Sequence, residues 1–204
     1  MLVTIVFLTV TLLSSIAAIF LINFYRDPKR VIPVGNCIVS PADGRIIRII
    51  ETSKKGLSVR KGLLGKVIVS SKDVADQCRI ISIFMSPLDV HINRAPIGGT
   101  VKLVSHSRGK FFRAYDFDKS LENEKNEIVI ENGRLRVKVI QIAGFLARRI
   151  KCCVSINQKI NKGGKIGMIC LGSQTMLIIP KHAALRIKLN ERVKGGETII
   201  ADLR

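Results

Sequence analysis

The chain has 204 residues, of which 47% are hydrophobic, so it can build one domain with a buried core. Its formal net charge of +19, from 34 lysines and arginines against 15 acidic residues, favours an anionic partner such as an acidic lipid or a nucleic acid. The chain has no tryptophan and only 5% aromatic residues. Few side chains could therefore stack on bases between the cations, which argues against nucleic acid.

The first predicted element is an apolar helix at residues 2–24. This run contains no charged side chain and exceeds the ~20 residues that cross a hydrocarbon core. Arg26, Lys29 and Arg30 come directly after it, and the positive-inside bias places the rest of the chain in the cytoplasm. A secretory signal is the competing interpretation, but no basic residue precedes the run, which is also longer than a typical signal core. We predict an anchor in the cell membrane at residues 1–25, either spanning or re-entrant, and a cytoplasmic domain at residues 26–204.

Past the anchor, the pattern predicts mostly β structure. Residues 134–139 alternate cations with aliphatic side chains, which indicates a strand with one buried face and one solvated basic face. Asn132-Gly133 before it is typical of a type I′ hairpin turn. A helix is expected only near residues 145–150. Further strands are expected at residues 45–50, 66–70, 79–85, 100–105 and 184–189.

Two segments, residues 156–167 and 189–200, resemble each other. Each holds a polar turn and then a glycine that lets the chain reverse before a buried strand. The pair resembles the two hairpin halves of biotinyl and lipoyl carrier domains, which flank a modified lysine on an exposed turn. Here Gly172-Ser173-Gln174-Thr175 lies between the halves, which disfavours a carrier. We expect a compact β sandwich or barrel-like domain of related architecture.

The five cysteines stand at positions 37, 78, 152, 153 and 170 and show no C-x-x-C spacing. Their odd number and their spacing argue against a disulfide framework and against a zinc site. We expect reduced thiols that pack as small hydrophobic side chains, and no metal.

Three short segments could together supply an acid, a base and a nucleophile: residues 40–44, residues 85–91 and Gly172-Ser173. A serine hydroxyl beside a carbonyl without Cβ hindrance can attack that carbonyl. An imidazole can take the hydroxyl proton, and a carboxylate can orient the imidazole and stabilise its cation. Taken singly, the first and third segments are common turns, and a lone histidine is more often structural.

The segments follow one another in an order that resembles the short form of the phosphatidylserine decarboxylase family, a group of self-processing, pyruvoyl-dependent enzymes. The resemblance runs from about Phe24 to about Pro180. Five stretches carry it: Phe24-Tyr25-Arg26-Asp27-Pro28, residues 40–45, Asp89-Val90-His91-Ile92-Asn93-Arg94-Ala95-Pro96, residues 142–150 and Leu171-Gly172-Ser173.

The resemblance implies that the chain cuts itself between Gly172 and Ser173. In that scheme Ser173 is the nucleophile, His91 the base and Asp43 the orienting acid, while Gly172 supplies the attacked carbonyl. The products would be a β chain, residues 1–172, and an α chain, residues 173–204, joined as a heterodimer whose further assembly stays open. Ser173 would become a covalent pyruvoyl group.

The same resemblance implies the reaction. The amine of a serine phospholipid would form a Schiff base with the pyruvoyl group, lose carbon dioxide and leave as the ethanolamine lipid, with His91 returning the proton. His106 is a further candidate for contacting the head group. Phosphatidylserine and the ether lipid archaetidylserine are equally open substrates, because only the head group takes part in the chemistry.

One position departs from the longer family members, which carry a second histidine three residues beyond the first. Arg94 stands there, so His91 would take the processing role itself. Two alternatives stay open. The chain could be a membrane-anchored, carrier-like binding module without self-cleavage, or a family member that folds but does not process.

Overall fold

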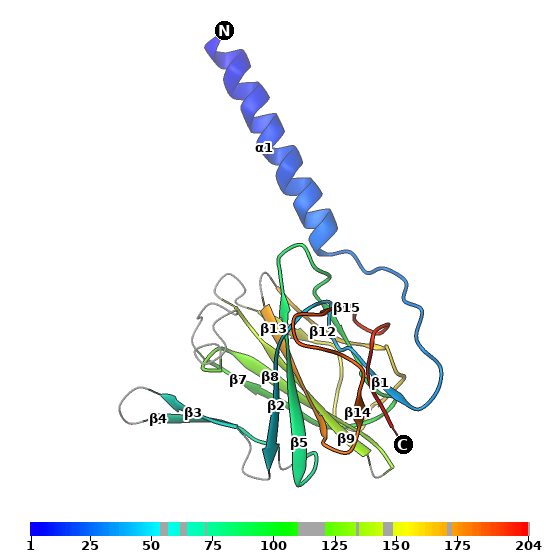
Figure 1. The fold of residues 1–204 in the computed structure, drawn as a ribbon. Helices are drawn as coiled ribbons and strands as arrows, with labels where there is room; N and C mark the ends of the chain where they lie inside the picture. The colour runs from blue at the N-terminus through cyan, green and yellow to red at the C-terminus, as the bar shows by residue number, and fades with distance from the viewer. Residues whose placement is uncertain are drawn as a thin grey trace.

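The computed structural model describes residues 1–53, 57–61, 65–71, 73–109, 121–133, 135–144, 149–170 and 173–203. In these residues one α-helix is followed by strands (Figure 1). The helix, α1, is Leu2–Phe24. The strands are β1 (Cys37–Val39), β2 (Gly44–Ser53), β3 (Leu57–Lys61), β4 (Gly65–Val69), β5 (Gln77–Met85), β6 (Ile92–Arg94), β7 (Gly99–Ser107), β8 (Lys125–Asn132), β9 (Leu135–Ile142), β10 (Ile150–Cys152), β11 (Lys159–Ile160), β12 (Lys165–Ile169), β13 (Ser173–Pro180), β14 (Ala184–Leu185), β15 (Arg192–Val193) and β16 (Ile199–Asp202).

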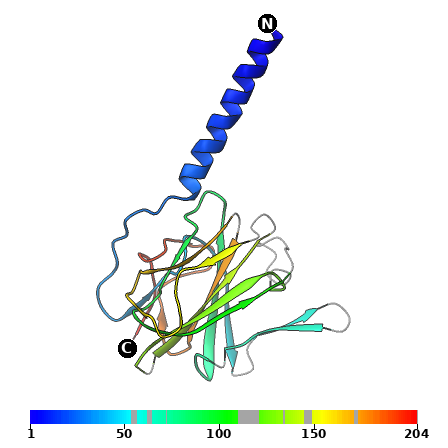
Figure 2. The same ribbon diagram turned by 180° about the vertical axis from the view of Figure 1, so that it is seen from behind.

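Helix α1 extends away from the β domain in both views (Figures 1 and 2). Its 23 residues have a mean hydropathy of 2.7 in their most apolar window, and none of that window packs inside the protein. At 1.5 Å per residue the helix is long enough for a hydrocarbon core of ~30 Å. The predicted helix is confirmed, and by length and composition it could anchor the chain in a membrane.

The largest sheet has eight antiparallel strands in the order β11-β7-β8-β9-β13-β5-β2-β15, and it curls into a half-barrel. All eight residues of the central strand β13 are buried, as its nearly continuous apolar run predicts. β13 pairs along its whole length with β5, where Ser173 lies opposite Met85, and on its other edge with β9. The two three-stranded sheets, β1-β16-β14 and β10-β12-β6, contribute to the same aliphatic core. The predicted mostly β, barrel-like fold is confirmed.

The two similar segments form two equivalent turns. Asn157 and Asn190 have left-handed backbones with φ of 68° and 67°, and Gly163 and Gly196 follow with φ of 78° and 81°. The amide of Asn157 donates to the Val101 carbonyl, and the amide of Asn190 donates in the same way to the Ile46 carbonyl. The two segments therefore form the equivalent turns that their sequence similarity predicts, while the likeness to carrier domains stays a prediction.

Three local expectations differ from the structure. The β8–β9 hairpin exists, but Asn132 still pairs with Leu135, and Gly133 takes the left-handed conformation with φ of 60°. The turn is therefore shifted by one residue from the predicted position. The helix expected near residues 145–150 is wrong at Ile150, which begins β10, and residues 145–148 lie outside the described part. The strand expected at residues 184–189 extends only over Ala184–Leu185.

The basic face predicted for residues 134–139 is also partly wrong. Arg136 is exposed, but Lys138 is fully buried, and its ammonium contacts Asp73 at 2.6 Å and Glu127 at 3.2 Å. The segment around Asp73 covers this side of β9, so the cation is paired inside the protein instead of facing solvent.

Candidate active site

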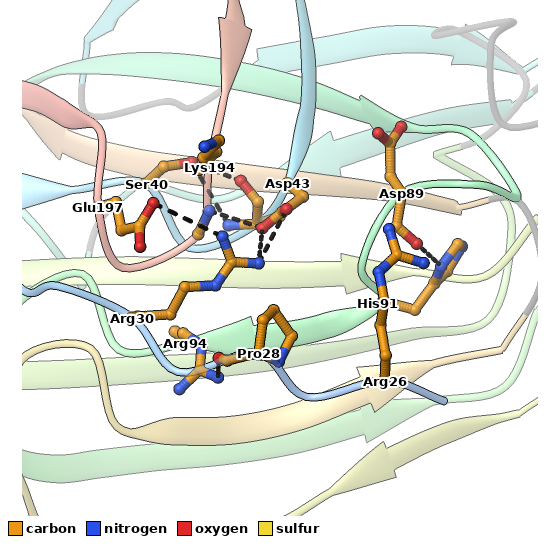
Figure 3. A network of polar contacts seen from close by, with 12 residues as sticks. Arg26, Pro28, Arg30, Ser40, Asp43, Asp89, His91, Arg94, Lys194 and Glu197 are labelled. Atoms are coloured by element: carbon orange, nitrogen blue, oxygen red, sulfur yellow. Dashed lines mark hydrogen bonds and ion pairs between the residues drawn. The ribbon is translucent and has the colours of Figure 1, made fainter. Parts of the chain in front are cut away.

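The carboxylate of Asp43 lies in the turn between β1 and β2 and binds an arginine. Both of its oxygens accept hydrogen bonds of 2.9 Å from the Arg30 guanidinium, and one also accepts from the Gly195 amide at 2.8 Å (Figure 3). The Arg30 and Asp43 side chains are only 6% and 14% exposed. Glu197 lies 3.8 Å from the same guanidinium. The Arg30–Asp43 ion pair is thus largely shielded from water.

The imidazole of His91 lies directly before β6 and is completely buried. Its Nδ1 is 2.8 Å from the main-chain oxygen of Asp89 (Figure 3). A carbonyl oxygen can only accept, so Nδ1 carries the hydrogen, and in the neutral ring Nε2 has a free lone pair. This buried Nε2 has no hydrogen-bond partner in the described part of the chain. The tautomer is the one that a general base at Nε2 needs.

Burial lowers the pKa of His91 below its ordinary value of 6.5, and the nearby Arg26 cation acts in the same direction. The hydrogen bond to Asp89, the Asp89 charge and, with the smallest effect, the Asp43 charge act the other way. The aromatic ring of Phe24, at the end of α1, covers the imidazole with its centroid 4.3 Å away. The ring is therefore held neutral at physiological pH.

Ser173 is the first residue of β13 and is also completely buried. Its hydroxyl contacts the sulfur of Met85 at 3.4 Å. A thioether is a weak acceptor, so this contact holds the hydroxyl proton only loosely. A stronger base could take that proton without competing against a good hydrogen bond.

The residues predicted from the sequence are only partly joined by the described contacts. Asp43 binds Arg30 instead of His91, and the Asp89 carbonyl fixes the imidazole tautomer that Asp43 was expected to fix. No described hydrogen bond joins His91 to Ser173. Gly172 lies outside the described residues. The roles assigned to these residues from the sequence stay predictions.

His106, predicted to contact a head group, lies in β7. It is about half exposed and lies 2.9 Å from the Glu124 carboxylate. Among the described residues, no group of three histidine, cysteine or acidic side chains gathers as a metal site, and the five cysteines are free thiols.

The sequence assigned Arg26 and Arg30 only to the basic cluster after the apolar helix, and it gave Arg26, Arg30 and Asn93 no place in the candidate active site. Arg30 pairs with Asp43, Arg26 donates to the Leu88 carbonyl in the loop before His91, and Asn93 donates to Thr175 near Ser173. Arg26 and Asn93 belong to stretches that carry the family resemblance, and that position was the available signal. Arg30 lies outside those stretches, so only its pairing in space reveals it.

Comparison with known proteins gives one family. A family model described as phosphatidylserine decarboxylase matches residues 17–201. A protein of Methanocaldococcus jannaschii, provisionally named archaetidylserine decarboxylase proenzyme, is 46% identical over 90% of this chain and 89% of its own length. Phosphatidylserine decarboxylase proenzymes of Chlorobium phaeovibrioides and Wolbachia pipientis are each 41% identical, over 93% and 88% of this chain and 81% and 74% of their own lengths.

Proposed function

The chain belongs to the phosphatidylserine decarboxylase family, and on this basis we propose that it is a proenzyme that cuts itself between Gly172 and Ser173 and then decarboxylates a serine phospholipid. The observation that carries the proposal is the buried Nε2 of His91, a lone pair with no partner in the described residues, in a chain whose family match includes Ser173.

Self-cleavage begins with proton transfer. His91 Nε2 removes the Ser173 hydroxyl proton, the oxygen attacks the Gly172 carbonyl carbon, and the peptide C–N bond breaks as the proton passes to the Ser173 nitrogen. The amide is now an ester. Removal of the Ser173 Cα proton then breaks the Cβ–Oγ bond and frees the Gly172 carboxylate, and water replaces the Ser173 nitrogen, which leaves as ammonia.

Asp89, Asp43 and Arg30 have separate tasks in this scheme. The Asp89 carbonyl fixes the His91 tautomer, and Asp43 stabilises the imidazolium through space with its charge. Arg30 holds the Asp43 carboxylate in place with two hydrogen bonds. Because the His91 pKa is lowered, the imidazole is ready to accept a proton at neutral pH.

The fit of a pyruvoyl group at position 173 rests on the same features. Residue 173 is buried, and the Nε2 of His91, which is also buried, has no hydrogen-bond partner among the described residues. Such a ketone supplies an acceptor for the electron pair released with carbon dioxide after it has combined with the substrate amine. His91, no longer needed as the base for Ser173, returns a proton to the substrate Cα.

The proposal that the protein is anchored in a membrane rests on α1 and on the cations directly after it. α1 could hold the domain at an interface, and Arg26, Lys29 and Arg30 favour the cytoplasmic side of an anionic cell membrane. A serine phospholipid with either ester or ether tails presents the same head group there. His106 is proposed as a head-group contact from its half-exposed position.

Two assays test the function. Electrophoresis of the purified chain should give fragments of residues 1–172 and 173–204, while Ser173→Ala should stay uncut. In parallel, carbon dioxide release is measured from vesicles of carboxyl-labelled phosphatidylserine and, separately, archaetidylserine. Cut protein should be active on at least one lipid, and Ser173→Ala on neither. A full-length chain that is active, or fragments in Ser173→Ala, would overturn the proposal.

A further inference from the structure

A chain of buried amide side chains crosses the barrel interior beside the candidate active site. The side-chain nitrogen of Asn126 donates to the Gln141 oxygen at 2.9 Å, and the Gln141 nitrogen donates to the Asn93 oxygen at 2.8 Å. The Asn93 nitrogen donates in turn to the Thr175 hydroxyl at 3.1 Å. None of the four side chains is more than 1% exposed. Asn126 therefore orients the Gln141 amide, and Gln141 orients the Asn93 amide.

The register of the large sheet explains how this chain forms. Asn126 lies opposite Gln141, and Gln141 lies opposite Thr175, so the three residues form one row across β8, β9 and β13. Asn93 comes from β6, in a different sheet, and reaches this row. Gly167 leaves room for the Gln141 amide, because a Cβ at position 167 would lie 2.7 Å from the Gln141 nitrogen. The amide chain therefore joins two sheets.

The two residues at its end have a defined relation to the chemistry. Asn93 lies two residues after His91, and Thr175 lies two residues after Ser173. In extended chain, residues two apart point to the same face. The hydroxyls of Thr175 and Ser173 both contact the Met85 sulfur at 3.4 Å, in agreement with a shared face on β13. The Asn93–Thr175 bond thus ties the segment of the base to the strand of the nucleophile.

Resting on the self-cleavage proposed above, we infer that Asn93, oriented by Gln141 and Asn126, is a positioning residue for that reaction and acts through Thr175 to hold the Ser173 hydroxyl where His91 can deprotonate it. Buried polar groups are costly unless they are paired, and the three hydrogen bonds along this chain fix the orientation of the Gln141 and Asn93 amides. The amide chain therefore sets a position instead of supplying a proton.

The test follows self-cleavage of the full chain made by cell-free synthesis into phospholipid nanodiscs. Thr175→Val keeps the β-branched shape but removes the hydroxyl that accepts from Asn93. Its cleavage rate should fall by roughly 10- to 100-fold, since a misplacement of about 1 Å can cost about 100-fold in rate. The separate variant Thr175→Ser keeps the hydroxyl, and its cleavage rate should stay within about threefold of the wild-type rate.

A matched control separates positioning from stability. The buried hydroxyl of Ser71 donates to the Ser53 carbonyl at 3.1 Å, in a segment outside the amide chain. Ser71→Ala loses a buried hydrogen bond as Thr175→Val does, so its melting temperature should also fall, but its cleavage rate should not. Gln141→Met, run in parallel, leaves the Asn93 oxygen without its donor and should slow cleavage even if Thr175→Val does not accumulate.

Hydroxylamine identifies the step affected. It cleaves an ester at position 173 but not an amide, so a defect in ester formation should leave Thr175→Val slow in its presence. Rapid cleavage by hydroxylamine would overturn the inference, because the ester would then form normally. Wild-type rates in both Thr175→Val and Gln141→Met, or equal slowing in Ser71→Ala, would also overturn it. An uncut wild-type chain would instead overturn the proposed function itself.

Discussion

His91 and Ser173 are two buried residues whose reactive polar atoms lack a strong hydrogen-bond partner in the described part of the chain. The hydroxyl of Ser173 touches only a thioether in the contacts described, and Nε2 of His91 touches no acceptor or donor. Buried polar atoms are nearly always paired, so each such exception needs an explanation. A reaction in which the imidazole takes the hydroxyl proton explains both.

The lowered pKa of His91 predicts how self-cleavage depends on pH. In the proposed scheme the neutral imidazole is the active form, and burial keeps it neutral to a lower pH than the ordinary 6.5. The cleavage rate should therefore stay on its plateau through neutral pH and fall as one group protonates at a midpoint below 6.5. Time courses of the wild-type chain at a series of pH values measure this midpoint. A midpoint at or above 6.5 would contradict the environment described for His91.

The same burial affects folding stability. Unfolded His91 would bind a proton at its ordinary pKa, whereas the folded ring resists protonation. This contribution to stability is complete above pH 6.5 and is lost as the pH falls through the lowered pKa. His91→Gln, which should not process, should lose less stability on acidification than uncut Ser173→Ala, as urea unfolding at several pH values would measure.

At the scale of elements, the segment after α1 is fastened to the site at several points. Arg26 donates to the Leu88 carbonyl, Asp27 pairs with Arg94, and Arg30 pairs with Asp43. Figure 3 shows Arg30 pointing at Asp43, and Arg26 lying beside Asp89 and His91. The end of α1 and the candidate active site therefore form one packed unit.

Removing the charge of Arg30 tests how much the Arg30–Asp43 pair stabilises this packing. Arg30→Gln leaves the Asp43 carboxylate, only 14% exposed, without its buried cation. We expect a loss of about 3 kcal/mol in the free energy of unfolding, as for other broken buried pairs. Urea unfolding followed by circular dichroism in the uncut Ser173→Ala background measures it. Arg186→Gln is the control, because Arg186 pairs with Asp202 while 60% exposed and should change little. Equal effects would contradict the buried pair.

Local sequence patterns predicted several of the strands and turns. The strand at residues 79–85 and the turn glycines at 163 and 196 follow from apolar runs and from backbone conformations that glycine alone adopts easily. The burial of Lys138 does not follow, since its partner Asp73 is 65 residues away in the sequence. The Gln141–Asn93 contact likewise joins residues 48 apart. Contacts of this kind depend on how the sheets close, which a local pattern cannot specify.

At the scale of the whole molecule, the proposed cut would not release the small fragment. β13 begins at the cleavage site, lies between β5 and β9 and is wholly buried. β15 pairs with β2, and β16 pairs with β1. Strands of the 173–204 fragment therefore pair with strands of the 1–172 fragment in two different sheets.

The two fragments should therefore stay together after cleavage. With an affinity tag on the N-terminus, the small fragment should co-purify in equal amount in mild detergent and separate only when the sheets unfold in denaturant. Recovery of the large fragment alone under native conditions would contradict this packing. The uncut Ser173→Ala chain is the control for complete recovery.

The mass of the fragment that begins at position 173 tests the central claim most directly. If Ser173 consumes its own peptide bond and becomes a pyruvoyl group, the fragment should be lighter than the hydrolytic peptide of residues 173–204 by the mass of one ammonia. It should also react with a hydrazine probe at its first residue. A fragment with the full hydrolytic mass and a free amino end, or a chain that stays whole under conditions of activity, would contradict the account.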